Sequence, residues 1–274
     1  MLFNKEHNYL ICIDSDGTVM DTMTSKHSIA LGPSFISTFG IDKNKDEILN
    51  EWIRINCFSL MRGYNRFYTL DIILDYVLRF GYSYSGRDEY HNWVKNTDSL
   101  SIPSILEEIK KANNPYCLNK ALEWARMSNE MIGNMNDAES FSEAIKSIHI
   151  LSKEADLIGV STANFKALTK EWTNERIIND FRLVASQEYG TKEVVIKKAL
   201  DLGYDPKNVI MIGDSSGDLD AAKECKIWFY PIIPKHENES WLLFMNEVRN
   251  IFFKGLFNEE YQNKLIEKYK EFLS

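Results

Sequence analysis

The chain has 274 residues, of which 44% are hydrophobic and 26% are charged, and its formal net charge is −8. This composition is typical of an ordinary globular protein, and the length suits one large domain or a core domain with an insertion. The negative charge argues against a nucleic-acid partner, and no apolar run is long enough to cross a bilayer, which argues against a membrane partner.

The amino-terminal residues 1–7 lack the basic and then apolar pattern of a secretory signal. The four cysteines are widely scattered, with no CxxC pair and no histidine at zinc-ligand spacing, so we expect neither a disulfide framework nor a zinc site. These features predict a cytoplasmic protein.

The first predicted strand, residues 9–13, is apolar and ends abruptly at Asp14, Ser15, Asp16 and Gly17. Open α/β sheets bind ligands at the carboxyl ends of their strands, so both carboxylates are expected to face one site. A carboxylate beside a magnesium ion can attack a phosphate ester, while a second, protonated carboxyl gives its proton to the leaving oxygen. An ordinary Asp-Gly turn at a strand end is the alternative.

From about residue 24 to residue 133 the sequence is rich in helical patterns and aromatic residues, with few strand-like runs. The predicted helices span residues 26–39, 46–58, 67–80 and 118–132, with breaks at 81–86 and 113–115. This region is expected to be an inserted helical subdomain. Within it, Arg62 and Arg66 flank a glycine turn and are candidates for bidentate binding of a second phosphate or a carboxylate of a substrate. Two solvated surface arginines are the alternative.

From residue 139 onward helices and strands alternate, which is typical of a parallel sheet. The predicted strand 156–160 is followed by Ser161 and Thr162 and by a helix starting at about Asn164. Backbone N–H groups at the start of that helix would favour a bound anion. The same Ser-Thr-Ala-Asn sequence is also a good ordinary helix cap.

Further along, a weaker strand is predicted near 182–185, a helix at 193–202 and a short apolar strand at 209–212. Lys192 opens the helix, and because cations do not favour a helix amino terminus, it needs an anionic partner. Asp214 and Asp218 follow the strand with a spacing that suits magnesium, although an Asp-rich turn before a helix is the alternative. Two helices in the tail, 234–274, are expected to pack on the core, or alternatively to form a dimer contact.

In this order the segments resemble the four motifs of the haloacid dehalogenase superfamily, whose members are mostly phosphatases. The first motif matches 14–22, and the others match Ser161, Lys192 and 213–218. The resemblance implies an α/β fold, a Rossmann-like doubly wound parallel sheet with an inserted α-helical cap. The implied division is a core of 1–22 and 134–233, a cap of 23–133 and a C-terminal helical extension, 234–274.

The resemblance also implies the role of each site residue. Asp14 is the nucleophile, Asp16 the acid and base, and Ser161 a hydrogen-bond donor to the phosphoryl group, with Thr162 as its neighbouring competitor. Lys192 offsets the negative charge that is crowded between the nucleophile and the phosphate. Magnesium is bound by Asp14, by Asp16 through its backbone carbonyl, and by Asp214, with Asp218 either binding through water or holding Lys192.

The carboxylate at Asp16 is absent from the dehalogenase and phosphonate-cleaving branches, so phosphate-ester chemistry is expected. One departure is Ser15, where many relatives carry a bulky apolar residue. The predicted function is magnesium-dependent hydrolysis of a small phosphorylated metabolite through a phospho-Asp14 intermediate, in a monomer or homodimer, with the cap closing to exclude water. The alternatives are a phosphosugar mutase of the same superfamily and a noncatalytic phosphometabolite-binding protein.

Overall fold

The computed structural model describes residues 3–135, 139–163 and 165–273. The chain divides into two compact units, Met1–Thr22 with Asp137–Ser274, here called the sheet unit, and Met23–Asn136, the helical unit. Asn164, the predicted start of a helix, lies outside the described residues. None of the described helices is both long and apolar enough to span a membrane.

The sheet unit is built on five parallel strands in the order β3-β2-β1-β4-β5. The strands are β1 (Leu10–Ile13), β2 (Asp156–Val160), β3 (Leu183–Ala185), β4 (Val209–Gly213) and β5 (Trp228–Pro231). Every residue of β1, β2 and β4 is buried, which explains why these strands are apolar runs without the alternation of a half-exposed strand. The sequence does not predict β5, whose Trp-Phe-Tyr-Pro segment has no aliphatic residue.

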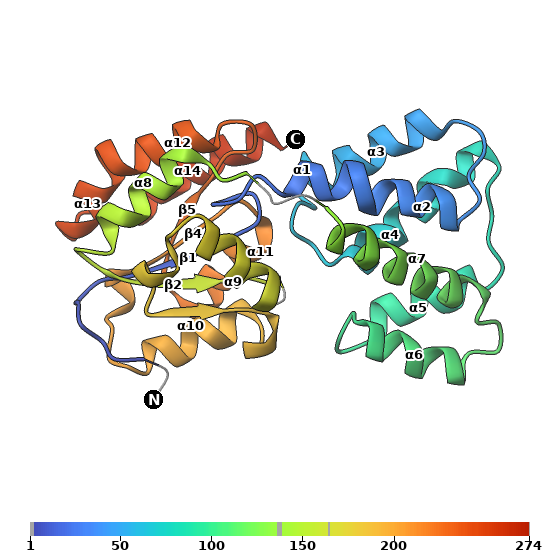
Figure 1. Ribbon diagram of the computed structural model, residues 1–274, viewed down its shortest axis with the longest axis horizontal. Helices are drawn as coiled ribbons and strands as arrows, with labels where there is room; N and C mark the ends of the chain where they lie inside the picture. The colour runs from blue at the N-terminus through green and yellow to red at the C-terminus, as the bar shows by residue number, and fades with distance from the viewer. Residues whose placement is uncertain (1–2, 136–138, 164, 274) are drawn as a thin grey trace. The chain divides into compact units, whose positions relative to one another are not determined.

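Helices cover both faces of the sheet (Figure 1). In the sheet unit they are α8 (Ser142–Leu151), α9 (Phe165–Asn174), α10 (Lys192–Leu200), α11 (Ser216–Cys225), α12 (Glu237–Leu243), α13 (Arg249–Phe253) and α14 (Glu259–Phe272). Ile11 and Ile13 of β1 share a core with residues of α8, α9, α12 and α13, whereas Leu10 and Cys12 share the opposite core with α10 and α11. The alternation of β1 side chains between two cores gives a doubly wound sheet.

The C-terminal helices belong to the sheet unit. Trp241, Phe244, Val248 and Phe252 are fully buried in the same core as Ile210 of β4. In addition, α12 packs against α8, and α14 packs along the edge strand β5. The large apolar residues from Trp241 to Phe252 therefore complete one core of the sheet, while Ile266 of α14 joins the opposite core.

The helical unit is inserted at a short antiparallel ladder on the sheet unit. Met20 forms a bridge with Ser140, the Asp21 N–H donates to the Glu139 carbonyl at 2.8 Å, and the Phe141 N–H donates to the Val19 carbonyl at 2.9 Å. The segments before and after the insertion are therefore neighbours in space.

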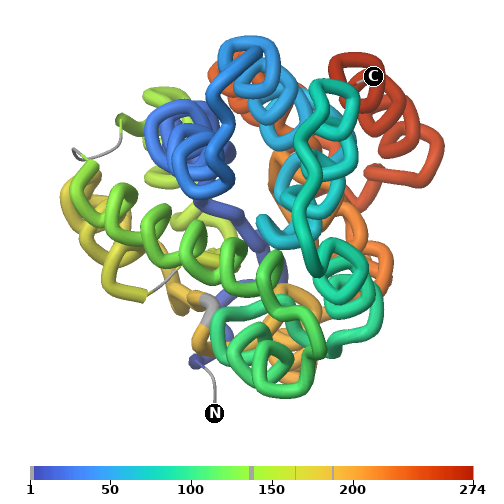
Figure 2. The backbone as a smooth tube through the Cα atoms, turned by 90° about the vertical axis from the view of Figure 1, so that its right-hand side faces the viewer, coloured from blue at the N-terminus to red at the C-terminus, as the bar shows by residue number. Residues whose placement is uncertain are grey.

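The helical unit is traced in Figure 2 from α1 in blue to α7 in green. Its elements are α1 (Met23–Ser25), η1 (Lys26–Leu31), α2 (Gly32–Thr38), α3 (Lys45–Cys57), α4 (Arg66–Tyr76), η2 (Val77–Phe80), α5 (Arg87–Asn96), α6 (Ile102–Lys111) and α7 (Tyr116–Gly133). Aromatic rings pack together within its core: the Trp52 ring stacks on Phe35 with centroids 5.2 Å apart and meets the edge of Trp124 with centroids 5.7 Å apart. The sequence does not predict α5 or α6, in which three residues of ten and one residue of ten, respectively, are buried hydrophobics.

Polar contacts around the buried Asp71 link two of these helices. The Arg87 guanidinium on α5 lies 2.6 Å from Asp71 Oδ1 and 2.8 Å from Asp75 Oδ1 on α4. His91 Nδ1 lies 2.9 Å from the other Asp71 oxygen. Burial alone would lower the pKa of Arg87, but the two carboxylates outweigh burial and raise it. The ion pairs of Arg87 and the His91 contact therefore stabilise the packing of α4 against α5.

Candidate active site

The candidate site lies where β1 and β4 end side by side. Asp14 directly follows β1, and its N–H donates to the Ile212 carbonyl of β4 at 3.0 Å. Asp214 directly follows β4. In the sheet, β1 lies between β2 and β4, so the chain builds the sheet first to one side of β1 and then to the other. The ends of β1 and β4 therefore form the switch point, where doubly wound sheets bind ligands.

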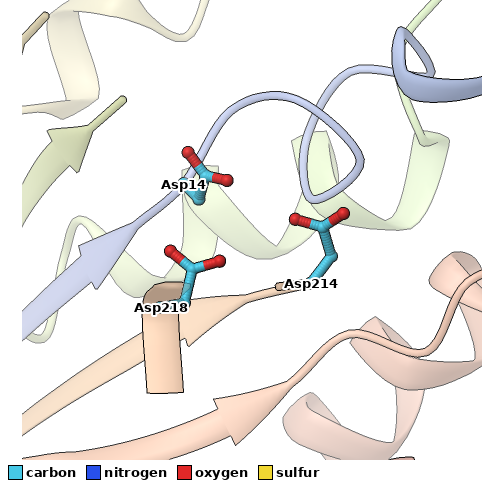
Figure 3. Close-up of side chains that lie close together, drawn as sticks. All are labelled: Asp14, Asp214 and Asp218. Atoms are coloured by element: carbon cyan, nitrogen blue, oxygen red, sulfur yellow. The ribbon is translucent and has the colours of Figure 1, made fainter. Parts of the chain in front are cut away.

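Three buried carboxylates meet at this point. Oxygen atoms of Asp14, Asp214 and Asp218 all lie within 4.8 Å of one another. Their residues are 6%, 1% and 0% exposed, respectively. Figure 3 shows the three carboxyl groups gathered at the strand ends, with Asp218 contributed by the first turn of α11. The structure thus brings together residues that are about 200 positions apart in the sequence.

The orientation of Asp218 is fixed locally. Its Oδ2 accepts hydrogen bonds from the Ser215 N–H at 3.1 Å and the Ser215 hydroxyl at 2.6 Å, and Ser215 in turn caps α11. This is a capping box, which satisfies backbone N–H groups at the helix start. A Cβ atom on Gly213 would lie 2.3 Å from the Asp218 carboxyl carbon, so only glycine leaves room for this carboxylate.

Lys192 bridges two of the three carboxylates. Its Nζ lies 3.0 Å from Asp14 Oδ1 and 2.5 Å from Asp218 Oδ1. Burial would lower the pKa of Lys192, but the charges of Asp14 and Asp218 outweigh it and raise the pKa. The lysine is therefore charged, and these two aspartates are the anionic partners that its place at a helix amino terminus requires.

One lysine does not balance three carboxylates. Burial raises the pKa of Asp14 well above the usual range, Lys192 opposes this, and the charges of Asp218 and Asp214 raise it further. A bound cation would relieve this excess of negative charge, and carboxylate oxygens are the ligands that magnesium prefers. The donor set therefore fits a magnesium ion.

Asp16 occupies the turn after Asp14. It is half-buried, and its Oδ1 accepts a hydrogen bond from the Thr22 hydroxyl at 2.5 Å. The turn is made possible by Gly17, whose φ of 75° is left-handed and whose N–H donates to the Met20 carbonyl at 2.8 Å. Among the described residues, the carboxylates that converge are those of Asp14, Asp214 and Asp218, and the Asp16 side chain is not one of them.

Two further contacts in the site were not predicted. The Thr18 hydroxyl donates to Asp214 Oδ1 at 3.2 Å, and the Trp172 indole N–H donates to the Ser15 hydroxyl at 3.0 Å. Trp172 lies over Gly159, where a Cβ would be 2.5 Å from the indole ring. The polar residue at position 15 therefore has a buried hydrogen-bond partner, which accounts for its difference from an apolar residue.

Ser161 follows β2, the neighbour of β1, and is 5% exposed. Its hydroxyl accepts a hydrogen bond from the Ala163 N–H at 3.1 Å, as in a local cap, while Thr162 is exposed. The Glu188 carboxylate accepts a hydrogen bond from the Phe165 N–H, at the start of α9, at 3.3 Å. Binding of a phosphoryl group by Ser161 or Thr162 stays a prediction.

The two predicted substrate-binding arginines lie in the helical unit. Arg62 is 2% exposed, and its Nη1 donates to the Cys57 carbonyl at 2.8 Å, so it is not a solvated surface residue. Arg66 is half-buried, donates to Asn129 Oδ1 at 2.8 Å, and lies 5.8 Å from the Trp124 ring. These contacts stabilise the helical unit, and a role in substrate binding stays a prediction.

No family model matches the sequence, and no curated protein matches it. Solved structures do match. A haloacid dehalogenase-like hydrolase from Streptococcus pneumoniae is 16% identical with a TM-score of 0.50, over 87% of this chain and 91% of that chain. A protein from Lactobacillus delbrueckii assigned as a phosphoglycolate phosphatase is 16% identical with a TM-score of 0.52, over 83% and 87%. The chain has the haloacid dehalogenase-like fold.

A third similar structure is that of a protein from Bacteroides vulgatus assigned as a β-phosphoglucomutase. It is 13% identical with a TM-score of 0.51, over 93% of this chain and 92% of that chain. The matches confirm the predicted α/β class and the predicted resemblance to haloacid dehalogenase-like proteins. At these identities the likeness concerns the fold, and the activities assigned to those proteins belong to them.

Proposed function

We propose that this chain is a magnesium-dependent phosphatase that hydrolyses a small phosphomonoester through an aspartyl phosphate on Asp14. The observation that supports the proposal is the convergence of Asp14, Asp214 and Asp218 within 4.8 Å at the switch point of the sheet, with Lys192 in contact with two of them. A nucleophile beside a cation site and a buried ammonium group is the arrangement that phosphoryl transfer needs.

In the first step, an Asp14 carboxylate oxygen attacks the phosphorus atom of the ester. The bond between phosphorus and the ester oxygen breaks, and the Asp16 carboxyl gives its proton to that oxygen, which leaves as the alcohol. The Thr22 hydroxyl, 2.5 Å from Asp16 Oδ1, holds that carboxyl in place. Lys192 offsets negative charge between the nucleophile and the phosphoryl group.

In the second step, a water molecule attacks the phosphorus atom of the aspartyl phosphate. Asp16 takes a proton from this water, the bond between phosphorus and the Asp14 oxygen breaks, and inorganic phosphate leaves. Both carboxyl groups then return to their starting protonation states. The Ser161 hydroxyl, at the end of the strand beside β1, is our candidate donor to a phosphoryl oxygen.

Asp14 and Asp214, with the Asp16 backbone carbonyl, are the residues that would hold the magnesium ion. When bound, magnesium neutralises charge on the carboxylates and on the phosphoryl oxygens. For Asp218 we favour the role of holding Lys192, because its Oδ1 contacts Lys192 and its Oδ2 accepts two hydrogen bonds from Ser215.

A phosphosugar mutase is the second candidate, supported by the fold similarity to the Bacteroides vulgatus protein. A mutase would use the same residues but return the phosphoryl group to the sugar instead of to water. Release of inorganic phosphate and formation of an isomeric phosphosugar are therefore the two products to measure.

The proposal is tested by screening phosphorylated metabolites with magnesium and comparing the wild type with Asp14→Asn. We expect phosphate release from the wild type and a loss of about 10³-fold or more in the variant, because the nucleophile is removed. The exposed Asp205, which caps a short turn away from the three carboxylates, gives the matched control Asp205→Asn, expected to retain activity.

Each other outcome has a defined meaning. Turnover that persists in Asp14→Asn contradicts the assignment of the nucleophile. Isomer formation without phosphate release supports the mutase, and metal binding without turnover of any compound supports a noncatalytic phosphometabolite-binding protein.

A further inference from the structure

We propose that the C-terminal helices α12 and α14 hold Asp214 in position for its cation, with Tyr269 of α14 as the main positioning residue. The inference rests on the proposed function, because it concerns the same magnesium site. It adds that the affinity of this site for metal depends on a part of the chain that carries none of the recognised motifs.

The first observation is a hydrogen bond to the backbone of Asp214. The Tyr269 hydroxyl donates to the Asp214 carbonyl oxygen at 2.9 Å, and the two residues are 0% and 1% exposed. Asp214 lies just beyond the end of β4, where regular sheet pairing stops at Gly213. A buried carbonyl that loses its donor costs about 1–3 kcal/mol, so this bond constrains where the Asp214 backbone can lie.

The second observation concerns the Asp214 side chain. Its Oδ1 accepts a hydrogen bond from the Thr18 hydroxyl at 3.2 Å. The backbone carbonyl of Thr18 accepts in turn from the indole N–H of Trp241 on α12 at 2.9 Å. Thr18 and Trp241 are both 0% exposed. The backbone of Asp214 is thus held by α14, and its carboxylate is held through Thr18 by α12.

The third observation is that the Tyr269 hydroxyl is rigidly placed. Its ring packs edge-on against Phe229 of β5, with centroids 6.4 Å apart and planes at 75°. Since α14 runs along β5 and β5 pairs with β4, the hydroxyl is fixed relative to the strand that carries Asp214. Groups that orient metal ligands in this way typically contribute 10–100-fold to metal affinity.

The competing explanation is that Tyr269 only stabilises the fold. In that case loss of the hydroxyl would lower the free energy of unfolding and leave the metal affinity unchanged. A direct measurement of metal binding separates the two explanations, because it needs neither a substrate nor turnover.

The experiment compares Tyr269→Phe with Tyr261→Phe on the intact chain. Tyr261 is on the same helix, but its hydroxyl donates to Glu247, so the same atom is removed away from the site. Mn²⁺ is titrated into each protein, and free Mn²⁺ is measured by electron paramagnetic resonance. We expect the Mn²⁺ dissociation constant to rise about 10-fold in Tyr269→Phe and to match the wild type in Tyr261→Phe.

A second readout uses turnover. At saturating magnesium, the rate of Tyr269→Phe is expected to return to within about twofold of the wild type, because the weaker affinity is overcome by concentration. If Tyr269→Phe does not fold, Trp241→Phe removes the donor to Thr18 instead and is expected to weaken Mn²⁺ binding several-fold.

Wild-type affinity for Mn²⁺ in the folded Tyr269→Phe protein overturns the inference and leaves the proposed function intact. The same holds for wild-type affinity in Trp241→Phe if that variant is the one used. A wild type that binds no Mn²⁺ overturns the magnesium site itself, and with it both proposals.

Discussion

Two buried aspartates stand at opposite ends of the same sheet and show opposite electrostatics. Asp156 begins β2 and Asp14 follows β1, and they are 0% and 6% exposed. The pKa of Asp156 is lowered, whereas the pKa of Asp14 is raised well above the usual range. Burial pushes both values upward, so the difference comes from their neighbours.

Asp156 is surrounded by donors. Its Oδ2 accepts from the Glu6 and His7 N–H groups at 2.9 and 2.8 Å and from the Tyr204 hydroxyl at 2.6 Å, and its Oδ1 accepts from Arg182 Nε at 2.9 Å. These bonds outweigh burial and lower its pKa. Its charge is compensated within the protein, so this aspartate ties the amino-terminal segment to the sheet.

Asp14 has Lys192 beside it, but Asp218 and Asp214 are close as well. Burial and charge are common to both ends of the sheet and do not by themselves mark a functional site. The difference lies in the charges nearby: Asp156 has a guanidinium group and hydrogen-bond donors around it, whereas Asp14 has two further carboxylates close to it. A crowded group of carboxylates suits a cation.

The largest effect on stability is expected for Asp156→Asn. The amide places a donor against groups that already donate, so we expect a loss of about 3 kcal/mol in the free energy of unfolding at pH 7, measured by urea denaturation. Because the folded pKa of Asp156 is depressed, its stabilisation is present above about pH 4 and is lost as the pH falls through the folded pKa. The difference between the two proteins should therefore shrink as the pH falls below about 4.

The control for this variant is Glu6→Gln, which removes the exposed partner of Arg182. Exposed pairs contribute little, so a change below about 0.5 kcal/mol is expected. Equal stability of Asp156→Asn and the wild type at pH 7 would contradict a structural role for the amino-end aspartate.

The next largest effect is expected for Gly213→Ala, which tests the crowding at the carboxyl end. The new Cβ would lie 2.3 Å from the Asp218 carboxyl carbon, so we expect a loss of about 2 kcal/mol and weaker Mn²⁺ binding. The control is Gly133→Ala at the end of α7 in the helical unit, where a new Cβ would meet no described atom within 4 Å. Its free energy of unfolding should be unchanged or slightly higher. Wild-type metal affinity in Gly213→Ala would show that the metal site does not depend on the position of Asp218.

The smallest expected effect is a gain in the free energy of unfolding instead of a loss. It tests most directly whether Asp14 and Asp156 have opposite electrostatic environments. Without metal, Asp14→Asn should be more stable than the wild type at pH 7, by on the order of 1 kcal/mol, because it removes one of three buried carboxylates that lie close together. The folded pKa of Asp14 is raised, so the wild type loses stability as the pH rises from about 4 through that pKa, while asparagine does not titrate.

The stability difference should therefore close below about pH 4. Added magnesium should reverse the order, since the wild type alone keeps the full set of ligands. Urea denaturation with a chelator and with magnesium measures both effects. A less stable Asp14→Asn protein in the chelator would mean that the aspartate is as well compensated as Asp156.

The fold was predictable where buried strands leave a simple pattern. Apolar runs of four or five residues that stop at Asp14, Ser161 or Asp214 report parallel strands covered on both faces. The pattern fails for β5, which is aromatic, and for α5 and α6, where seven and nine residues of ten are not buried. In these elements, packing against the rest of the fold overrides a weak local signal.

The site was predictable as a set of positions, but the contacts between them were not. Thr18 and Asp214 are 196 residues apart, and Trp241 is 223 residues from Thr18, so no local spacing links them. Arg62 is a further example, because arginine is rarely buried and its place inside the helical unit has no sequence signal. Such contacts follow from the path of the whole chain.

The antiparallel pairing between residues 19–21 and 139–141 has a consequence for how the helical insertion can change in evolution. It holds the two ends of the helical insertion at adjacent points, about 5 Å apart as in any antiparallel pair. A connection that starts and finishes at one place can be lengthened, shortened or exchanged for another module without rethreading the strands. The helical unit can therefore change in evolution while the strand ends that carry Asp14 and Asp214 stay as they are.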